Sequence, residues 1–412
     1  MRPTQSSNDN DNKRQRVDSP TSSKRARIDS PSHSTAILGT VQPHVASHYN
    51  NIVQKNIYER QLSDTIGLKN YNNWVKSILI KEYAINQYYT TLQQQFADST
   101  HPQRGVVVLD LCCGKGGDIK KYIKNKLPVE LYIGVDHAYQ SLCDMVQRFS
   151  TGHSMLYPAL IVHADCHRQL ISTVLHSNVY YDIVSVQFAL HYSFESKACA
   201  DIFIRNIAER LVPNGRIILT IPDSNILIYK LRMCTEQNTV AVKNNVCTVT
   251  FDSSTYDNTT KLFDGSSPYG IRYNFILKDA IDDCPEYIVH MSTLLELFQQ
   301  YNVHVQYDMN LHEFWAQYSS QPEYSDLARH MNVVSSHQRN AAPISPDEWD
   351  AIGLYKAVVL MKQPSKNDPV IHRRAKYPYN KQLGKLSVDD ICVCLEAGKD
   401  KCRSTHDIVL NK

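Results

Sequence analysis

Short apolar blocks recur through the middle of the chain, and polar stretches with helical spacing separate them. Three of the blocks occupy residues 107–110, 131–136 and 181–192, and another ends at Asp165. Each block ends in a charged or polar residue. Short buried strands that alternate with helices are typical of a parallel sheet, whose ligands bind at the carboxyl ends of the strands. The pattern therefore predicts a doubly wound α/β fold.

A helix is expected before the first strand, because apolar residues such as Trp74 and Ile78 recur at helical spacing within residues 69–92. This helix would pack on the sheet. Its first turn carries three polar residues, Asn72, Asn73 and Lys76. They would face the glycine-rich end of the first strand if the helix crosses there. Their polar character alone favours a position that faces solvent.

The first apolar block leads into a glycine-rich turn, in the sequence VVLDLCCGKGGD of residues 107–118. The exposed N–H groups of such a turn, with the start of the following helix, can hold the polar groups of a ligand. The sequence is neither G-x-G-x-x-G nor a Walker motif. The acid two residues before the turn favours S-adenosylmethionine over a dinucleotide or ATP. A turn that merely ends a strand is the alternative.

Two later acids strengthen the case for a ligand. Asp136 follows Asp110 by 26 residues, close to the spacing expected of an acid that binds ribose hydroxyls in one βαβ unit. Asp165 ends the next block. Either acid could instead cap a helix.

Composition places the fold between residues 44 and 362. Residues 1–43 contain no Phe, Trp or Tyr and cannot form a core. They hold two basic clusters, KRQRVDSP and KRARIDSP, which indicate a nuclear import signal or a nucleic-acid contact. Each cluster ends in Ser-Pro, a candidate site for phosphorylation; an ordinary solvated tail is the alternative. Residues 363–412 form a second, basic extension.

Hydrophobic residues make up 42% of the chain, and no apolar run reaches the length of about 18 residues that a membrane span needs. We therefore expect no membrane partner. Eleven scattered cysteines predict reduced thiols in the cytosol or nucleus. Cys392, Cys394 and Cys402 lack a fourth matched ligand, so we expect no metal there.

An aromatic cluster with a histidine, QFALHYSFE, occupies residues 187–195 at the end of the fourth block. Such a cluster suits stacking and hydrogen bonding of a planar base. A structural role for His191 is the alternative.

Four segments together resemble eukaryotic mRNA cap guanine-N7 methyltransferases: VLDLCCGKGGDIKKY, HYN…LKNYNNWVKSILI, QFALHYSFES and CPEYIVHMSTLLELF. The resemblance runs from about His48 to Met361. It implies a Rossmann-like, mostly parallel seven-stranded sheet with an inserted antiparallel substrate-binding segment. It also implies methyl transfer from S-adenosylmethionine to N7 of the cap guanine.

The resemblance assigns site residues. Cofactor binding is implied for Lys76 and Asp110 near the methionine end, Asp136 at the ribose and Asp165 at the adenine. The remaining cofactor residues would come from the turn and from the fourth strand: Cys112, Gly114, Gln187 and Tyr192.

The cap would be held by a second set. Asn72 and Asn73 resemble residues that contact the RNA 5′ end, and a basic group would face the triphosphate: Lys115, Lys121 and Arg148. The guanine would be positioned by three further residues, none acting as acid, base or nucleophile: His191, Glu286 and Tyr355. No metal is expected.

One departure weakens the match, because Cys112 stands where the family usually has glycine. A Cβ and thiol there could crowd the cofactor. A catalytically weakened relative that binds capped RNA is therefore the alternative function, and a methyltransferase of small molecules or proteins is a third. We expect a nuclear monomer whose partner is 5′-capped mRNA. Further candidate partners are a small activating subunit, other capping enzymes and RNA polymerase II.

Overall fold

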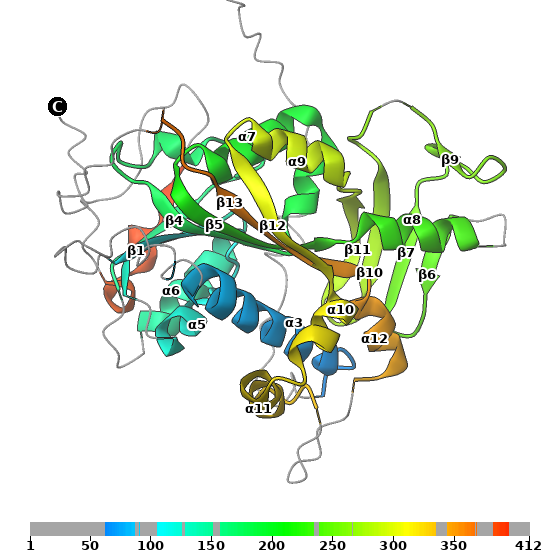
Figure 1. Ribbon diagram of the computed structural model, residues 1–412, viewed down its shortest axis with the longest axis horizontal. Coiled ribbons are helices and arrows are strands. Elements are labelled where there is room, and N and C mark those ends of the chain that lie inside the picture. Colours follow the sequence, from blue (N-terminus) through cyan, green and yellow to red (C-terminus); the bar gives the residue numbers. More distant parts are fainter. Residues whose placement is uncertain are drawn as a thin grey trace, which may run out of the picture. The chain divides into compact units, whose positions relative to one another are not determined.

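The computed structural model describes residues 62–86, 90, 105–125, 128–150, 157–234, 239–265, 267–334, 344–366, 368 and 382–394. An eight-stranded sheet runs through this part, in the order β12-β13-β5-β4-β1-β2-β3-β14 (Figure 1). Its strands are β1 (Val106–Leu111), β2 (Val129–Asp136), β3 (Ala159–His163), β4 (Tyr181–Gln187), β5 (Leu211–Pro222), β12 (Val303–Asn310), β13 (Tyr355–Lys362) and β14 (Cys392–Val393). Among these strands, β13 is antiparallel to both of its neighbours, β12 and β5, and every other neighbouring pair is parallel.

Helices cover both faces of the sheet. Alternate residues of β1 belong to different cores: Val106 and Val108 pack on one face, and Val107 and Leu109 on the other. This period of two explains why the strand reads as a continuous apolar block. Figure 1 shows α7 and α9 on one face and α3, α5 and α6 on the other. These helices are α3 (Ile66–Ile78), α5 (Ile119–Lys124), α6 (Tyr139–Ser150), α7 (Lys197–Ala208) and α9 (Met291–Gln299).

Shorter helical elements complete this part of the fold. A π-helical segment, Leu79–Asn86, continues α3, so the entry helix is confirmed as far as Asn86. The remaining elements are α8 (Ser224–Met233), α10 (Leu311–Tyr318), α11 (Pro322–His330), α12 (Pro346–Ile352) and the 3-10 segments Ile171–Thr173, Leu190–Glu195, Leu383–Lys385 and Val388–Asp390.

An antiparallel sheet is inserted between β5 and β12, as predicted. Its order is β11-β10-β7-β6, and its strands are β6 (Val240–Lys243), β7 (Cys247–Phe251), β10 (Arg272–Leu277) and β11 (Ile281–Tyr287). The polar stretch after Phe251 forms turns and a small hairpin of β8 (Tyr256–Asp257) and β9 (Leu262–Phe263).

The structure confirms the predicted fold class and corrects two details. The sheet has one strand more than the expected seven, because β14 pairs in parallel with β3. The fourth block is not a strand as far as Tyr192. It leaves the sheet after Gln187, where Phe188 takes a φ of 57° that no extended strand allows, and Leu190–Glu195 is a 3-10 helix.

The basic tail 1–43 lies outside the described residues, as does Cys402, and the domain boundaries stay predictions. Nine described cysteines are free thiols, whereas Cys392 is disulfide-bonded, contrary to the expectation of reduced thiols. Across the described residues, no helix is both long and apolar enough to cross a lipid bilayer.

Candidate functional site

The glycine-rich turn after β1 curls back over the carboxyl end of the sheet. The backbone N–H of Cys113 donates to Val135 O of β2 at 3.0 Å. Cys112 and Gly114 both have left-handed backbone conformations, with φ of 57° and 53°. A Cβ built on Gly114 meets nothing within 4 Å, so the turn borders open space there. A ligand can therefore approach the backbone of the turn closely.

Asp136 at the end of β2 lies against this turn. Its carboxylate accepts hydrogen bonds of 2.7 Å from the backbone N–H groups of Gly114 and Ala138. Burial raises the pKa of Asp136, and the two backbone donors oppose that rise. The spacing of 26 residues from Asp110 thus corresponds to real proximity between the first turn and the second strand.

Asp110 lies at the same edge and is almost fully buried. The hydroxyl of Tyr132 donates to its carboxylate at 2.7 Å. Burial, and next the nearby charge of Asp118, raise the pKa of Asp110 to about 7. A buried carboxylate at this edge favours a cationic group of a ligand.

A charged network joins α3 to the start of α5. Asp118 lies 3.0 Å from Lys76 Nζ and 2.6 Å from Lys121 Nζ. Lys121 also donates to Asn73 Oδ1 at 3.2 Å. Burial opposes ionisation of Asp118, but the two lysines hold its pKa down at about 2. The helix therefore crosses the turn, which its polar composition alone had not favoured. Because α3 begins at Ile66, Asn73 and Lys76 lie beyond its first turn, in which the sequence had placed them.

The other two predicted basic residues are Lys115, in the turn after β1, and Arg148, on α6. Lys115 Nζ is 2.6 Å from Asp144 Oδ2. Burial acts to raise the pKa of Asp144, but hydrogen bonds from Lys115 and Gln140 and the charge of Arg148 hold it below its usual value. On α3, Asn72 Oδ1 is buried and makes no hydrogen bond within the described part of the chain.

Asp165 lies just beyond β3, within a group of hydrogen-bond donors. It accepts the backbone N–H of His167 at 3.1 Å, and Arg168 Nε is 3.5 Å away. Burial opposes ionisation, but the side chain of His167 holds the pKa of Asp165 below its usual value. Arg168 also contacts Glu195 at 2.5 Å, which ties this loop to the predicted aromatic cluster.

Gln187 ends β4 with its side-chain amide held by the sheet. It donates to Ser185 Oγ at 3.2 Å and to Ile218 O at 3.1 Å, and it accepts from Thr220 Oγ1 at 3.1 Å. These contacts fix the amide at the carboxyl edge of the sheet, directly before the other residues of the aromatic cluster.

A buried pair of polar side chains lies beyond β4. His191 Nε2 is 3.4 Å from Glu286 Oε1, and both side chains are only 2% exposed. Neither ring nitrogen of His191 makes a well-aligned hydrogen bond within the described residues, so this approach is an ion-pair distance without hydrogen-bond geometry. Buried polar groups are nearly always hydrogen-bonded, so a buried imidazole that makes no hydrogen bond here is a candidate for contact with a ligand.

Aromatic side chains gather at this edge of the sheet. The rings of His191 and Tyr192 lie 4.3 Å apart, and Tyr192 is in turn 6.3 Å from the ring of His167, beside Asp165. Tyr355 at the start of β13 is buried, with its ring 5.1 Å from Phe188. Ring contacts thus link His191, through Tyr192, to the loop that carries Asp165.

Comparison with known proteins decides the family. A model of the mRNA (guanine-N(7))-methyltransferase domain matches residues 34–363. The mRNA cap guanine-N(7) methyltransferase 1 of Oryza sativa subsp. japonica is 35% identical, over 83% of this chain and 85% of the rice protein. The protein of the same name from Arabidopsis thaliana is 33% identical, over 84% and 87%. The Schizosaccharomyces pombe mRNA cap guanine-N(7) methyltransferase is 31% identical, over 79% and 83%.

This chain belongs to the mRNA (guanine-N7)-methyltransferase family. It is accordingly an S-adenosylmethionine-dependent methyltransferase that acts at guanine N7 of the mRNA cap. The residues of the site fit this cofactor: the turn is open at Gly114, and acids lie at the ends of the first two strands.

Sequence reasoning gave no role to three residues that shape the site of this mRNA (guanine-N7)-methyltransferase. Asp118 was visible as the last residue of the glycine-rich motif. Tyr132 and Tyr273, which donate to Asp110 and Glu286, carried no signal, because each meets its carboxylate only through strand pairing.

Proposed function

We propose that the cap methyltransferase holds S-adenosylmethionine across the turn after β1 and positions the cap guanine in the pocket beyond β4. The observation that carries this proposal is the buried pair of His191 and Glu286, which lacks a hydrogen-bonding partner for the imidazole in the described structure. Asp110 and Lys76 would bind the methionine end, Asp136 the ribose and Asp165 the adenine. Gly114, Gln187 and Tyr192 would line the same cavity.

Glu286 would distinguish guanine from adenine. A carboxylate accepts hydrogen bonds from guanine N1–H and the exocyclic amine, which adenine cannot offer in that arrangement. Tyr273 occupies one oxygen of Glu286 at 2.8 Å and so fixes the plane of the carboxylate. This contact restricts rotation of the Glu286 carboxylate, so its remaining lone pairs keep a defined direction.

The chemistry needs positioning more than proton transfer. S-adenosylmethionine supplies a methyl group on a positively charged sulfur, which leaves as a neutral thioether. Guanine N7 carries a lone pair and no proton, so the chain needs no general base. Alignment of two reactants can supply on the order of 7–11 kcal/mol. His191, Glu286 and Tyr355 would provide this alignment in a pocket that excludes water, because all three are buried.

Transfer also leaves the guanine positively charged. The carboxylate of Glu286 and the faces of the aromatic rings of Tyr192 and Tyr355 would stabilise that charge as it develops. The same residues would then contribute to both recognition and rate.

The basic residues would hold the rest of the cap. Lys115 in the turn, Arg148 on α6 and Lys121 on α5 would contact the triphosphate. The two asparagines of α3 would contact the first nucleotides. Phosphate contacts carry little sequence information, so transcripts would be accepted whatever their sequence. We further propose a nuclear monomer, with an activating subunit, other capping enzymes or RNA polymerase II as candidate partners.

The decisive experiment measures methyl transfer from labelled S-adenosylmethionine to RNA that carries an unmethylated guanosine cap. The same RNA with a 5′ triphosphate is the control. Transfer to capped RNA alone, at guanine N7, is the expected result. Transfer to neither RNA by folded protein would point to a missing activating subunit or to the weakened, RNA-binding relative that Cys112 suggests. Binding of capped RNA that stays without turnover when candidate subunits are added would then identify the weakened relative.

A further inference from the structure

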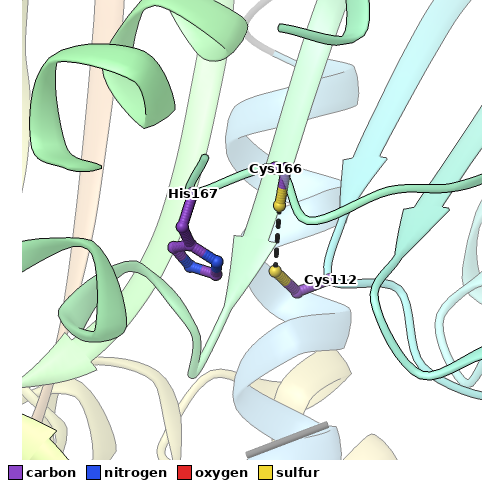
Figure 2. Close-up of side chains that lie close together, drawn as sticks. All are labelled: Cys112, Cys166 and His167. Atoms are coloured by element: carbon purple, nitrogen blue, oxygen red, sulfur yellow. Dashed lines mark hydrogen bonds between the residues drawn. The ribbon is translucent and has the colours of Figure 1, made fainter. Parts of the chain in front are cut away.

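Two cysteines and a histidine converge beside the glycine-rich turn (Figure 2). Cys112 comes from the turn itself, and Cys166 and His167 come from the loop after β3. The two sulfurs are 3.6 Å apart. One ligand atom from each of the three residues lies within 4.8 Å of the others. Cys166 and His167 are buried, and Cys112 is partly buried.

We infer that Cys112, Cys166 and His167 form a binding site for a thiophilic divalent cation of the zinc and cadmium type. Thiolate and imidazole are the ligands that such ions prefer. The proposal gives the chain a metal site beside its proposed cofactor site, where the sequence predicted no metal.

The spacing of the sulfurs favours a metal over a disulfide. In a tetrahedral zinc site with Zn–S bonds of about 2.3 Å, two sulfurs are about 3.8 Å apart. The observed 3.6 Å is close to this value. A disulfide would need the sulfurs to close to about 2.05 Å. A metal ion therefore requires a smaller movement of the two sulfurs than a disulfide would.

His167 is held as metal-binding histidines usually are. Its Nδ1 is 3.5 Å from Asp165 Oδ1, and its Nε2 is 3.4 Å from Ala189 O. A ligand histidine typically donates its other N–H to a carboxylate or a backbone carbonyl, which fixes the ring. Either nitrogen can therefore coordinate while the other keeps an acceptor. The ring also stacks on Phe203 at 4.5 Å, which limits its rotation.

Binding changes no oxidation state. Two sulfur–metal bonds and one nitrogen–metal bond form, both S–H bonds break, and the two protons pass to solvent. The two thiolates then neutralise the cation. Three protein ligands leave the fourth position of a tetrahedral ion for water.

The location gives the site a consequence that rests on the proposed function. Cys112 lies in the turn proposed to hold the cofactor, and Cys166 directly follows Asp165, the proposed adenine residue. An ion that joins these two loops would hold them together across the cofactor cavity. Bound metal should therefore weaken S-adenosylmethionine binding.

The test titrates cadmium into the metal-free full chain under a non-thiol reductant, and follows the ultraviolet charge-transfer absorbance of cadmium–sulfur bonds. We expect one tight equivalent in the wild type. Cys166→Ser and His167→Ala should lose more affinity than the roughly 10–100-fold that removal of an outer-shell partner costs. Cys112→Gly should lose as much, and it should fold, because glycine suits the φ of 57° at this position.

Cys143→Ser is the matched control, because this half-buried thiol lies on α6 outside the cluster. It should retain the tight equivalent. Equal cadmium affinity in the wild type, Cys166→Ser and Cys112→Gly would overturn the proposed metal site.

Calorimetry with S-adenosylmethionine separates this inference from the proposed function. Zinc should weaken cofactor binding to the wild type by at least about tenfold, or about 1.4 kcal/mol. It should leave the cofactor affinity of Cys166→Ser unchanged. Failure of the metal-free wild type to bind the cofactor would overturn the proposed function instead. If the wild type bound metal and its cofactor affinity did not fall, the proposed competition between metal and S-adenosylmethionine would be wrong.

Discussion

At the scale of single residues, the proposed recognition of guanine depends on one buried carboxylate, Glu286. We predict that Glu286→Gln lowers methyl transfer to capped RNA and leaves S-adenosylmethionine affinity unchanged. A hydrogen bond to a charged group is worth about 1.5–3 kcal/mol, so the loss of kcat/KM should be roughly 10- to 150-fold. Steady-state kinetics with capped RNA and calorimetry with the cofactor would measure the two effects.

Tyr273→Phe is the graded control for this prediction. It removes the hydroxyl that donates to Glu286 at 2.8 Å but keeps the carboxylate. Its effect should be smaller than that of Glu286→Gln and in the same direction. If Glu286→Gln instead abolished cofactor binding, the division between the guanine pocket and the cofactor cavity would be wrong.

How far the sequence predicts this pocket depends on how local each contact is. His191 lies in a distinctive string, and the resemblance supplied Glu286. The contact between Tyr273 and Glu286 could not be predicted from the sequence. It depends on the register of β10 against β11, in which these two residues are direct partners. Register between strands is a tertiary property that one sequence does not display.

At the scale of elements, Asp118 fastens α3 to α5. We predict that Asp118→Asn destabilises the fold by about 3–5 kcal/mol, because it leaves Lys76 and Lys121 as neighbouring cations without their shared carboxylate. Urea denaturation would measure the change. Asp201→Asn is the matched control, since its pair with Lys197 is exposed and should contribute no more than about 1 kcal/mol. Equal losses in the two variants would contradict the assigned role of this network.

The same carboxylate predicts a pH dependence. The pKa of Asp118 is about 2 in the folded chain, below its usual 3.8. A depressed carboxyl pKa gives stability that is present above about pH 4 and is lost as the pH falls toward 2. The difference in melting temperature between the wild type and Asp118→Asn should therefore narrow from pH 5 to pH 3. A constant difference across this range would show that the charge of Asp118 is not what stabilises the fold.

The strands could be predicted from the sequence where the apolar pattern along the chain marks them clearly. The first three strands read as apolar blocks because both of their faces are buried. The fourth was predicted too long, since the left-handed backbone at Phe188 has no signature in the residue type. The two residues of β14 are too few for any periodicity, and the edge of β3 supplies their pairing partner.

The C-terminal strand should nevertheless matter for stability. Leu383 leads into it and is fully buried in the same core as α6. We predict that Leu383→Ala costs about 2–5 kcal/mol. Val388→Ala nearby should cost less than about 0.5 kcal/mol, because Val388 is 40% exposed. Chemical denaturation of both variants checks this, and equal costs would mean that residues 382–394 add little to the core.

At the scale of the whole molecule, net charge conceals how the chain would hold RNA. The formal charge is only +3, yet the residues proposed to face the triphosphate are basic and lie on one turn and its neighbouring helices. Contacts with phosphates release counterions, so their number determines how steeply affinity falls with salt. The slope of this dependence therefore tests the placement of the charges more directly than affinity at a single salt concentration.

We predict that Arg148→Ala lowers the slope of log affinity against log salt by about 0.7–1. Capped RNA and 5′-triphosphate RNA should be affected alike, because both carry the phosphates that Arg148 would contact. Lys197→Ala is the control, since this exposed lysine on α7 is paired with Asp201 and lies outside the proposed cap site. Fluorescence anisotropy across a salt series would give the slopes. If the slope of Arg148→Ala matched that of the wild type while affinity fell equally at every salt concentration, Arg148 would act by supporting α6 through Asp144 rather than by contacting phosphate.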